Sequence, residues 1–223
     1  GKNPVNYWIH TNMLTVNGQK MSKSLNNSFL PQELFSGEHT LLDKGYSPMV
    51  VKFFMYQAHY RSTLDFSNEA LNASEKGFKK LMASYLLLEK LFASEVSEWD
   101  GKEWRTRCFA AMNDDFNSPI LIAELFDAVR IINSVNDGHL KIDQPNLTLL
   151  KETLHLFIVQ ILGIDVDFEE SGSTTQLMDF IVELRNDAKL NKNFATSDKI
   201  RNELQKLGFE IKDTKEGAIW SKK

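Results

Sequence analysis

The sequence predicts a mainly α protein with a small α+β domain at its C-terminal end, and two observations support this prediction. Within residues 47–164, apolar residues recur at three- and four-residue steps in four stripes, which is typical of an antiparallel helix bundle. Residues 165–174 are acidic and rich in glycine and serine, which is typical of a linker. The expected segments are therefore 1–46, a helical bundle over 47–164, a linker over 165–174 and a small domain over 175–223.

The first segment predicts a short hairpin and a short helix. Residues 13–16 (MLTV) form the predicted strand and lead into Asn17-Gly18, a pair that tolerates the positive φ of a tight turn. The polar residues 19–27 follow, and we call them the lysine loop. Pro31 then marks the start of a short helix.

Helix start and stop signals divide the bundle. Three side chains that can cap a helix N-terminus stand at the starts of predicted helices: Ser47, Ser67 and Asp100. Ser118-Pro119 opens a further helix. Gly138 and Gly163 are the predicted ends of the last two helices. The longest apolar stripe runs from Leu71 to Phe92, and we expect its members in the core.

The last segment predicts two helices followed by two strands. The apolar positions of these helices are Leu177, Phe180, Ile181, Leu184 and Ala188 in the first, and Ile200, Leu204 and Leu207 in the second. The strands are expected at 209–212 and 218–220, with Trp220 in the core of this domain. A unit of roughly 50 residues is marginal alone, so we expect it to rely on a neighbour or a ligand.

The composition is that of a globular protein and excludes several functional classes. Of 223 residues, 42% are hydrophobic and 25% are charged, so the chain can bury a substantial core. The 26 Lys and Arg residues against 30 Asp and Glu residues give a formal net charge of −4, which leaves any nucleic-acid contact to local patches. A single cysteine, Cys108, excludes an internal disulfide and a cysteine-rich zinc site. Without a long apolar run or a signal-peptide pattern, we expect a cytoplasmic protein with no membrane contact.

The most informative segment lies in the lysine loop and reads Lys20-Met21-Ser22-Lys23-Ser24. Two ammonium groups on a loop of small hydroxylated residues suit a polyphosphate, because lysine supplies a mobile point charge while hydroxyls and backbone amides add hydrogen bonds. Such a loop raises a reaction rate if it tightens on pyrophosphate as that group leaves. Lysines at this spacing are also common on solvated loops, so the spacing alone leaves a structural explanation open.

Several stretches together carry a family resemblance. They are Lys20–Ser24 of the lysine loop (KMSKS), Val5–His10 (VNYWIH), Ala58–Phe66 (AHYRSTLDF), Ala111–Pro119 (AMNDDFNSP) and the order of residues from Arg185 to Trp220. The first is similar to the second signature of class I aminoacyl-tRNA synthetases. Taken together, the stretches resemble the cysteinyl-tRNA synthetases, and the resemblance extends from Val5 to Trp220.

The resemblance implies a role for each segment. In this family the KMSKS loop closes over ATP, so Lys20 and Lys23 are the expected catalytic residues. Lys23, Ser22 and Ser24 are the expected ATP-binding residues, on a loop that we expect to be mobile without nucleotide. Residues 1–46 would be the end of the catalytic domain with its connecting segment, the bundle would bind the anticodon stem, and the small domain would read the anticodon.

The resemblance also implies RNA contacts and reaction partners. The expected tRNA-binding residues are Arg61, Lys189, Phe194 and Asp198. Phe194 matches an aromatic that stacks on a base, and Asp198 a carboxylate available to a base edge, which is how unpaired bases are read. The implied function is the activation of cysteine with ATP and its transfer to tRNA(Cys) by a monomeric enzyme, with zinc only in the intact enzyme.

The chain departs from the family pattern in four places. Asn26 stands where glycine is usual, but asparagine tolerates left-handed backbone, so we expect the turn to persist. Segment 37–46 is longer than the usual connection, and Lys52 stands where arginine is more usual. The H-I-G-H motif and the family's zinc ligands have no counterpart. We therefore expect this polypeptide alone to make no cysteinyl adenylate.

Alternative explanations remain open. His59–Arg61 could close a helix end or hold a domain junction, and Asp114–Asn117 is interpreted as a corner between helices. Cys108 is expected to be a small buried hydrophobe. Weak candidates for phosphate contacts are Lys76, Lys79, Lys80, Lys199, Arg201 and Lys206. The alternative functions are a cysteine ligase of thiol biosynthesis, whose relatives lack a full anticodon domain, and a non-catalytic tRNA-binding module.

Overall fold

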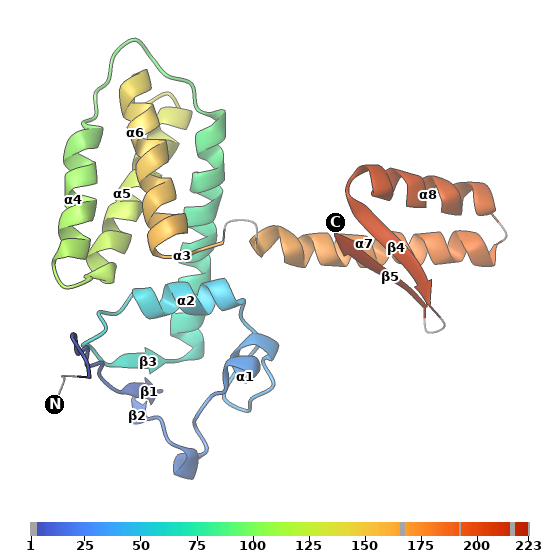
Figure 1. Ribbon diagram of the computed structural model, residues 1–223, viewed down its shortest axis with the longest axis horizontal. Helices are drawn as coiled ribbons and strands as arrows, with labels where there is room; N and C mark the ends of the chain where they lie inside the picture. The colour runs from blue at the N-terminus through green and yellow to red at the C-terminus, as the bar shows by residue number, and fades with distance from the viewer. Residues whose placement is uncertain (1–3, 166–167, 192, 215–216, 223) are drawn as a thin grey trace. The chain divides into compact units, whose positions relative to one another are not determined.

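The computed structural model describes residues 4–165, 168–191, 193–214 and 217–222. The chain forms two compact units, residues 1–165 and 166–223 (Figure 1). In the part of the chain that is described, no helix combines the length and the apolar character that crossing a bilayer requires.

A small sheet in the first unit has the strand order β2-β1-β3. β1 (Leu14–Val16) pairs antiparallel with β2 (Gln19–Lys20) and parallel with β3 (Leu64–Phe66). The predicted hairpin turn is confirmed, because Asn17 and Gly18 both have positive φ, 50° and 76°.

β3 is absent from the sequence prediction because three residues carry little periodicity, and a parallel partner is reached by a crossover instead of a turn. The Asp65 carboxylate joins this strand to the hairpin. Its Oδ1 accepts hydrogen bonds from Thr15 Oγ1 at 2.6 Å and from the Gly18 amide at 2.8 Å. β3 therefore fixes the hairpin that leads into the lysine loop.

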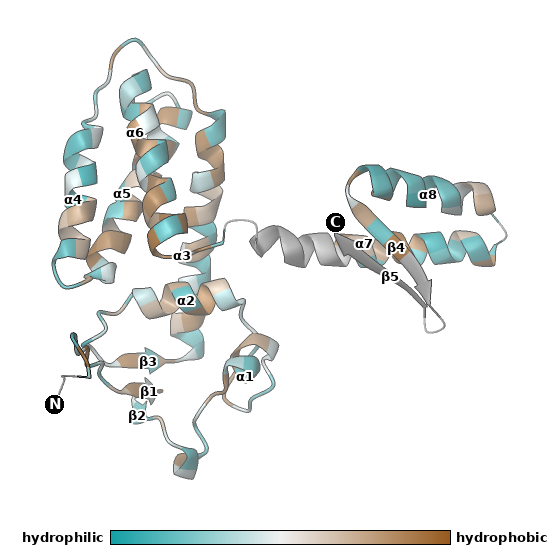
Figure 2. Ribbon diagram, viewed as in Figure 1, coloured by the Kyte–Doolittle hydropathy of each residue, from teal (hydrophilic) through white to brown (hydrophobic). Residues whose placement is uncertain are grey.

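The helices described in the first unit are α1 (Pro31–Ser36), α2 (Pro48–Tyr56), α3 (Asn68–Leu87), α4 (Gly101–Asn113), α5 (Ser118–Asn136) and α6 (Gln144–His155). Figure 1 shows α3 to α6 side by side as a bundle, with α2 and the sheet at one end. In Figure 2, apolar and polar residues alternate around these helices, as amphipathic packing requires.

The three predicted N-caps are confirmed, because the side chains of Ser47, Ser67 and Asp100 accept hydrogen bonds from backbone amides in the first turn. Ser118 and Pro119 open α5, as predicted, while Asn117 holds the cap position without a side-chain bond.

The core of the bundle contains most of the predicted apolar stripes. Phe53 of α2 is fully buried, with its ring centroid 5.6 Å from that of Phe78 and 6.5 Å from that of Phe126. Phe92 is an error of the prediction, since it is 89% exposed. The reason is that α3 ends at Leu87 and a 3₁₀ turn, η2 (Leu88–Lys90), breaks the helical period before Phe92.

The last bundle helix ends in an unpredicted way. α6 continues as a π-helical segment, η3 (Leu156–Ile161). Two side chains of α2 satisfy the carbonyls that follow it: Lys52 Nζ donates to Gly163 O at 2.7 Å, and the Tyr56 hydroxyl donates to Leu162 O at 3.0 Å. Lys52 therefore acts here as a point donor, which needs none of the planar geometry of arginine.

The second unit consists of α7 (Phe168–Leu190), α8 (Phe194–Lys206), β4 (Phe209–Thr214) and β5 (Gly217–Lys222). The predicted order of two helices and an antiparallel strand pair is confirmed. α7 begins inside segment 165–174, for which the sequence predicts a linker. Serine and glycine lower helix propensity only modestly, so packing of the following residues can extend a helix across them.

The buried face of α7 differs from the prediction. Leu177, Phe180 and Leu184 are about half exposed, whereas Met178 and Val182 are buried. Leu207 of the second predicted helix is also exposed, while Leu204 is buried as predicted. The predicted and the observed buried positions of α7 share one helical period, and apolar residues between Leu177 and Leu184 lie on more than one side of the helix, so their spacing does not fix which side is buried. The side chain of Trp220 lies outside the described residues.

We predict that Phe53→Ala lowers the free energy of unfolding by about 3–5 kcal/mol, since it leaves a cavity among buried rings. Phe92→Ala is the matched control and is expected to change it by less than about 0.5 kcal/mol, because that ring is solvated. Urea unfolding followed by tryptophan fluorescence measures both, and equal losses would contradict the assignment of the core.

Candidate functional site

The lysine loop leaves the sheet at Lys20 and forms a single 3₁₀ turn, η1 (Lys23–Leu25). Asn26 closes the turn in the left-handed region, with φ 52° and ψ 33°. The expectation that asparagine can replace glycine at this position is confirmed. The turn places Lys23 and Ser24 on the solvent side.

One side chain ties the two ends of this turn together. The Asn27 side chain is buried, with 5% exposure. Its Oδ1 accepts from the Ser22 amide at 2.8 Å, and its Nδ2 donates to Lys20 O at 3.2 Å. Asn27 is not among the site residues predicted from the sequence, because its role appears only once its partners Lys20 and Ser22 are known.

The two serines expected at ATP make contacts inside the loop. Ser22 Oγ accepts from the Leu25 amide at 3.3 Å and lies 3.2 Å from Ser24 Oγ. Ser22 therefore acts as the N-cap of η1. The hydroxyls shape the turn from which the lysines project.

Both lysines of the loop are exposed. Within the described residues, neither the Lys20 nor the Lys23 ammonium group has an ion pair or a hydrogen bond. A purely structural role would bring such lysines to a carboxylate or a carbonyl, as happens at Lys52. The two charges are therefore available to an anionic ligand.

A second cluster joins the chain after α2 to the corner between α4 and α5. The Tyr60 hydroxyl donates to Asp115 Oδ1 at 2.7 Å, and the Arg61 guanidinium forms an ion pair with the same carboxylate. The His59 Nδ1 accepts from the Arg61 amide, so its Nε2 carries the proton and donates to the Asp115 carbonyl at 3.2 Å. These contacts are of the kind expected if His59–Arg61 hold a junction between parts of the chain.

The corner itself is strained. Asp115 and Phe116 both have φ of 55°, which non-glycine residues rarely adopt. The contacts from Tyr60 and Arg61 hold the backbone in this conformation. The prediction of a structural corner at Asp114–Asn117 is confirmed. The Arg61 side chain, expected at tRNA, is engaged by Asp115.

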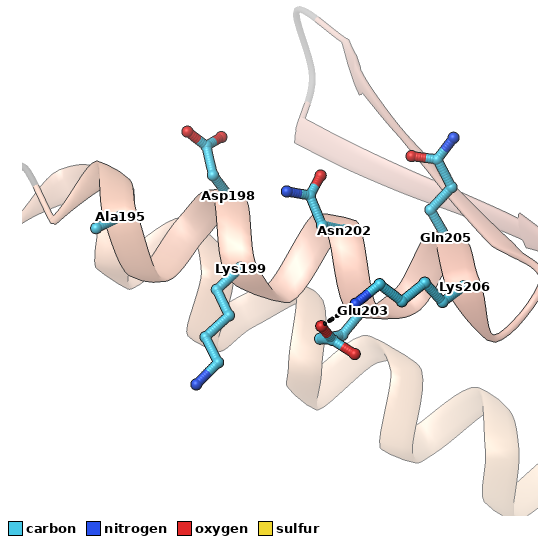
Figure 3. Close-up of a pocket in the computed structure, with 7 residues that line it drawn as sticks. All are labelled: Ala195, Asp198, Lys199, Asn202, Glu203, Gln205 and Lys206. Atoms are coloured by element: carbon cyan, nitrogen blue, oxygen red, sulfur yellow. Dashed lines mark hydrogen bonds and ion pairs between the residues drawn. The ribbon is translucent and has the colours of Figure 1, made fainter.

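In the second unit, Phe194 opens α8 and is 62% exposed. Asp198 is also exposed, with Arg201 4.0 Å away. Figure 3 shows Asp198, Asn202 and Gln205 pointing to the same side of α8, while Lys199 points to the other. Lys189 lies in the last turn of α7 and is half-buried.

Several other candidates have partners or no accessible chemistry. Lys79 pairs with Glu75 at 2.9 Å, and Lys206 pairs with Glu203 at 2.7 Å. The hydrogen bond from Lys44, together with Lys79, lowers the pKa of Glu75. Burial raises the pKa of the Cys108 thiol to about 12, so it is a buried hydrophobe, as predicted.

We predict that Asn27→Ala exposes the lysine loop to proteolysis. Loss of both buried hydrogen bonds costs about 1–3 kcal/mol, which corresponds to a roughly 5- to 100-fold rise in trypsin cleavage after Lys20 and Lys23. Asn26→Gly, which keeps the turn, is the control. An unchanged cleavage rate in Asn27→Ala would show that the amide does not hold the loop.

Comparisons with known proteins agree with this arrangement. Residues 1–76 match the tRNA synthetases class I (C) catalytic domain, and residues 109–166 match the DALR domain. Proteins named cysteine–tRNA ligase are 52% identical over 224 residues in Parabacteroides distasonis and 50% identical over 227 residues in Bacteroides fragilis, with 99% of this chain and 46% of each relative covered. The protein of this name in Chlorobaculum tepidum is 40% identical over 232 residues, with 100% of this chain and 46% of the relative covered.

The chain thus spans about half the length of the curated relatives it matches. The similarity includes the lysine loop, the bundle and the second unit together. The chain is therefore similar to proteins named cysteine–tRNA ligase along nearly its whole length, and it contains regions that match a class I (C) synthetase catalytic domain and a DALR domain.

Proposed function

We propose that this chain forms the lysine-loop and tRNA-binding part of a cysteine–tRNA ligase, which activates cysteine with ATP and transfers it to tRNA(Cys). The observation that carries the proposal is the pair of exposed, unpaired ammonium groups of Lys20 and Lys23 on a turn tied by Asn27. Similarity to proteins named cysteine–tRNA ligase over 99% of this chain supports the choice of amino acid and RNA.

Lys20 and Lys23 are the proposed phosphate ligands. When the cysteine carboxylate attacks the α-phosphorus, the bond to pyrophosphate breaks and negative charge accumulates on the leaving group. Ammonium groups at that position stabilise the transition state more than the ground state, which is what raises the rate. Ser22 and Ser24 shape the loop and add donors for the phosphate oxygens.

The proposal places recognition of the cysteine thiol in the part of the relatives that this chain does not span. No group of three or more His, Cys, Asp or Glu residues that could hold a metal ion occurs in the described ranges. The zinc that the resemblance implies would therefore be held by residues of the longer protein. The chain alone is accordingly proposed to form no cysteinyl adenylate.

The second unit is the proposed reader of the anticodon. Phe194 offers an exposed ring for stacking, and Asp198 offers a carboxylate to a base edge. Asn202 and Gln205 lie on the same side of α8 as Asp198, and their amides can both donate and accept (Figure 3). Lys189 is proposed to contact the RNA near this surface, and Arg61 through the first unit.

A second candidate function is tRNA docking without catalysis. The coverage of 46% of each relative favours it for the isolated polypeptide, because the lysine loop is present while the H-I-G-H motif is not. The presence of α7 to β5 weighs against the thiol-biosynthesis ligase, whose relatives lack a full anticodon domain.

In the full-length ligase, Lys23→Ala is predicted to lower cysteine-dependent ATP–pyrophosphate exchange by about 10²- to 10³-fold, the usual effect of removing one transition-state donor. Binding of tRNA(Cys) should change less than about twofold, since the ammonium faces the nucleotide. Lys90→Ala, which removes an exposed lysine of the 3₁₀ turn η2 after α3, is the control for net charge. Equal losses in exchange and in tRNA binding would show that the role of the loop is misassigned.

Phe194→Ala is predicted to weaken binding of tRNA(Cys) to this chain by about 5- to 100-fold, because a stacked base contributes about 1–3 kcal/mol. A gel-shift assay compares tRNA(Cys) with a tRNA whose anticodon is altered, and the preference between them should fall in the variant. Phe92→Ala removes a still more exposed ring from the first unit and should leave both affinities unchanged. Equal affinity of the unaltered chain for both tRNAs would refute anticodon reading.

A further inference from the structure

The segment that is longer than the family's usual connection, residues 37–46, has no role in the function proposed above. We call it the strap. Its two ends are pressed together: a Cβ added to Gly37 would lie 2.3 Å from the Gly45 amide nitrogen, and one added to Gly45 would lie 2.3 Å from Phe35 O. The Tyr46 amide also donates to Leu34 O at 2.9 Å. The strap is therefore a closed loop that begins and ends beside α1.

The middle of the strap is anchored to the start of α3. The Asn68 side-chain amide holds it from both sides, donating to Leu41 O at 3.1 Å and accepting from the Asp43 amide at 3.1 Å. Lys44 adds an ion pair with Glu75, about two α3 turns further on. The strap thus has a fixed path over the first unit.

This path brings His39 against Phe29. The ring centroids are 4.7 Å apart with an interplanar angle of 83°, an edge-to-face contact. The Phe29 ring also contacts Phe66 of β3, with the ring centroids 6.0 Å apart. His39 Nδ1 accepts from the Leu41 amide at 3.2 Å, which fixes the orientation of the imidazole.

Phe29 lies two residues after Asn27, at the end of the lysine loop. The start of the loop is fixed by pairing of β2 with β1, and the Met21 amide donates to Leu14 O at 3.0 Å. The end of the loop has no strand partner in the described residues, and it is positioned by Asn27 and by the two rings that contact Phe29. One of these rings, His39, belongs to the strap.

We propose that the strap positions the lysine loop, with His39 as the positioning residue that acts on Lys23 through Phe29 and Asn27. This inference rests on the proposed function only for its effect on ATP chemistry. The effect on the loop itself can be measured without any activity. An edge-to-face pair of this kind changes an equilibrium by about two- to tenfold.

The first experiment uses this chain and trypsin. His39→Ala should raise the rate of cleavage after Lys23 by about two- to tenfold, and His39→Phe, which keeps an aromatic edge at Phe29, should restore the original rate. Glu38→Ala changes an exposed neighbour in the strap and should have no effect. Cleavage of His39→Ala at the original rate, or failure of His39→Phe to restore it, would overturn the proposal.

The second experiment measures ATP–pyrophosphate exchange in the full-length ligase. His39→Ala should lower kcat/KM for ATP by about two- to tenfold without changing KM for cysteine or the affinity for tRNA(Cys), and His39→Phe should restore it. A parallel loss in all three quantities would indicate general damage and overturn the positioning role. If Lys23→Ala is fully active, the proposed function is wrong, and the trypsin result still tests the positioning role of the strap. If the His39 variants behave like the parent while Lys23→Ala does not, only the strap proposal is wrong.

Discussion

The side-chain amide of Asn27 joins the two ends of the lysine loop, and the position of Lys23 depends on this pair of hydrogen bonds. The turn between these ends is too short to hold itself, since a single 3₁₀ turn has little intrinsic stability. Burial of a side-chain amide costs little free energy when its oxygen and its nitrogen are both hydrogen-bonded, whereas its removal leaves the partner groups unpaired and destabilises the fold. The loop can therefore present two ammonium groups to solvent without using either of them in its own structure, and this leaves both charges for a ligand.

The remainder of the first unit supports this arrangement through α2. Phe53 and its neighbouring rings bury one face of the helix in the bundle, and Lys52 and Tyr56 satisfy the carbonyls at the end of the π-helical segment. Directly after α2, the Asp115 carboxylate receives Tyr60 and Arg61. Exposed ion pairs contribute little stability, so the value of these polar contacts lies in fixing a strained corner, whereas apolar burial supplies most of the stabilisation.

The sequence allowed the fold class, the hairpin, three N-caps and the two-helix, two-strand order of the second unit to be predicted, because each depends on local periodicity or turn chemistry. It did not allow β3 or the π-helical end of the bundle to be predicted, because these depend on contacts between distant residues. The solvent exposure of Phe92 was missed because the periodic pattern does not show that α3 ends in a 3₁₀ turn. In the site, the lysines could be singled out from charge and spacing. Asn27 and Asp115 could not, since their roles appear only when their partners are known.

The central claim is that Lys20 and Lys23, which have no partner among the described residues, become covered by the phosphates of ATP in the proposed ligase. Acetylation of individual lysines in the full-length protein, quantified by mass spectrometry with and without ATP and cysteine, tests it most directly. The account predicts rapid modification of both lysines in the absence of substrates and strong protection in their presence, while Lys90 reacts equally in both conditions. Modification of Lys20 and Lys23 at the same rate with and without substrates would contradict it.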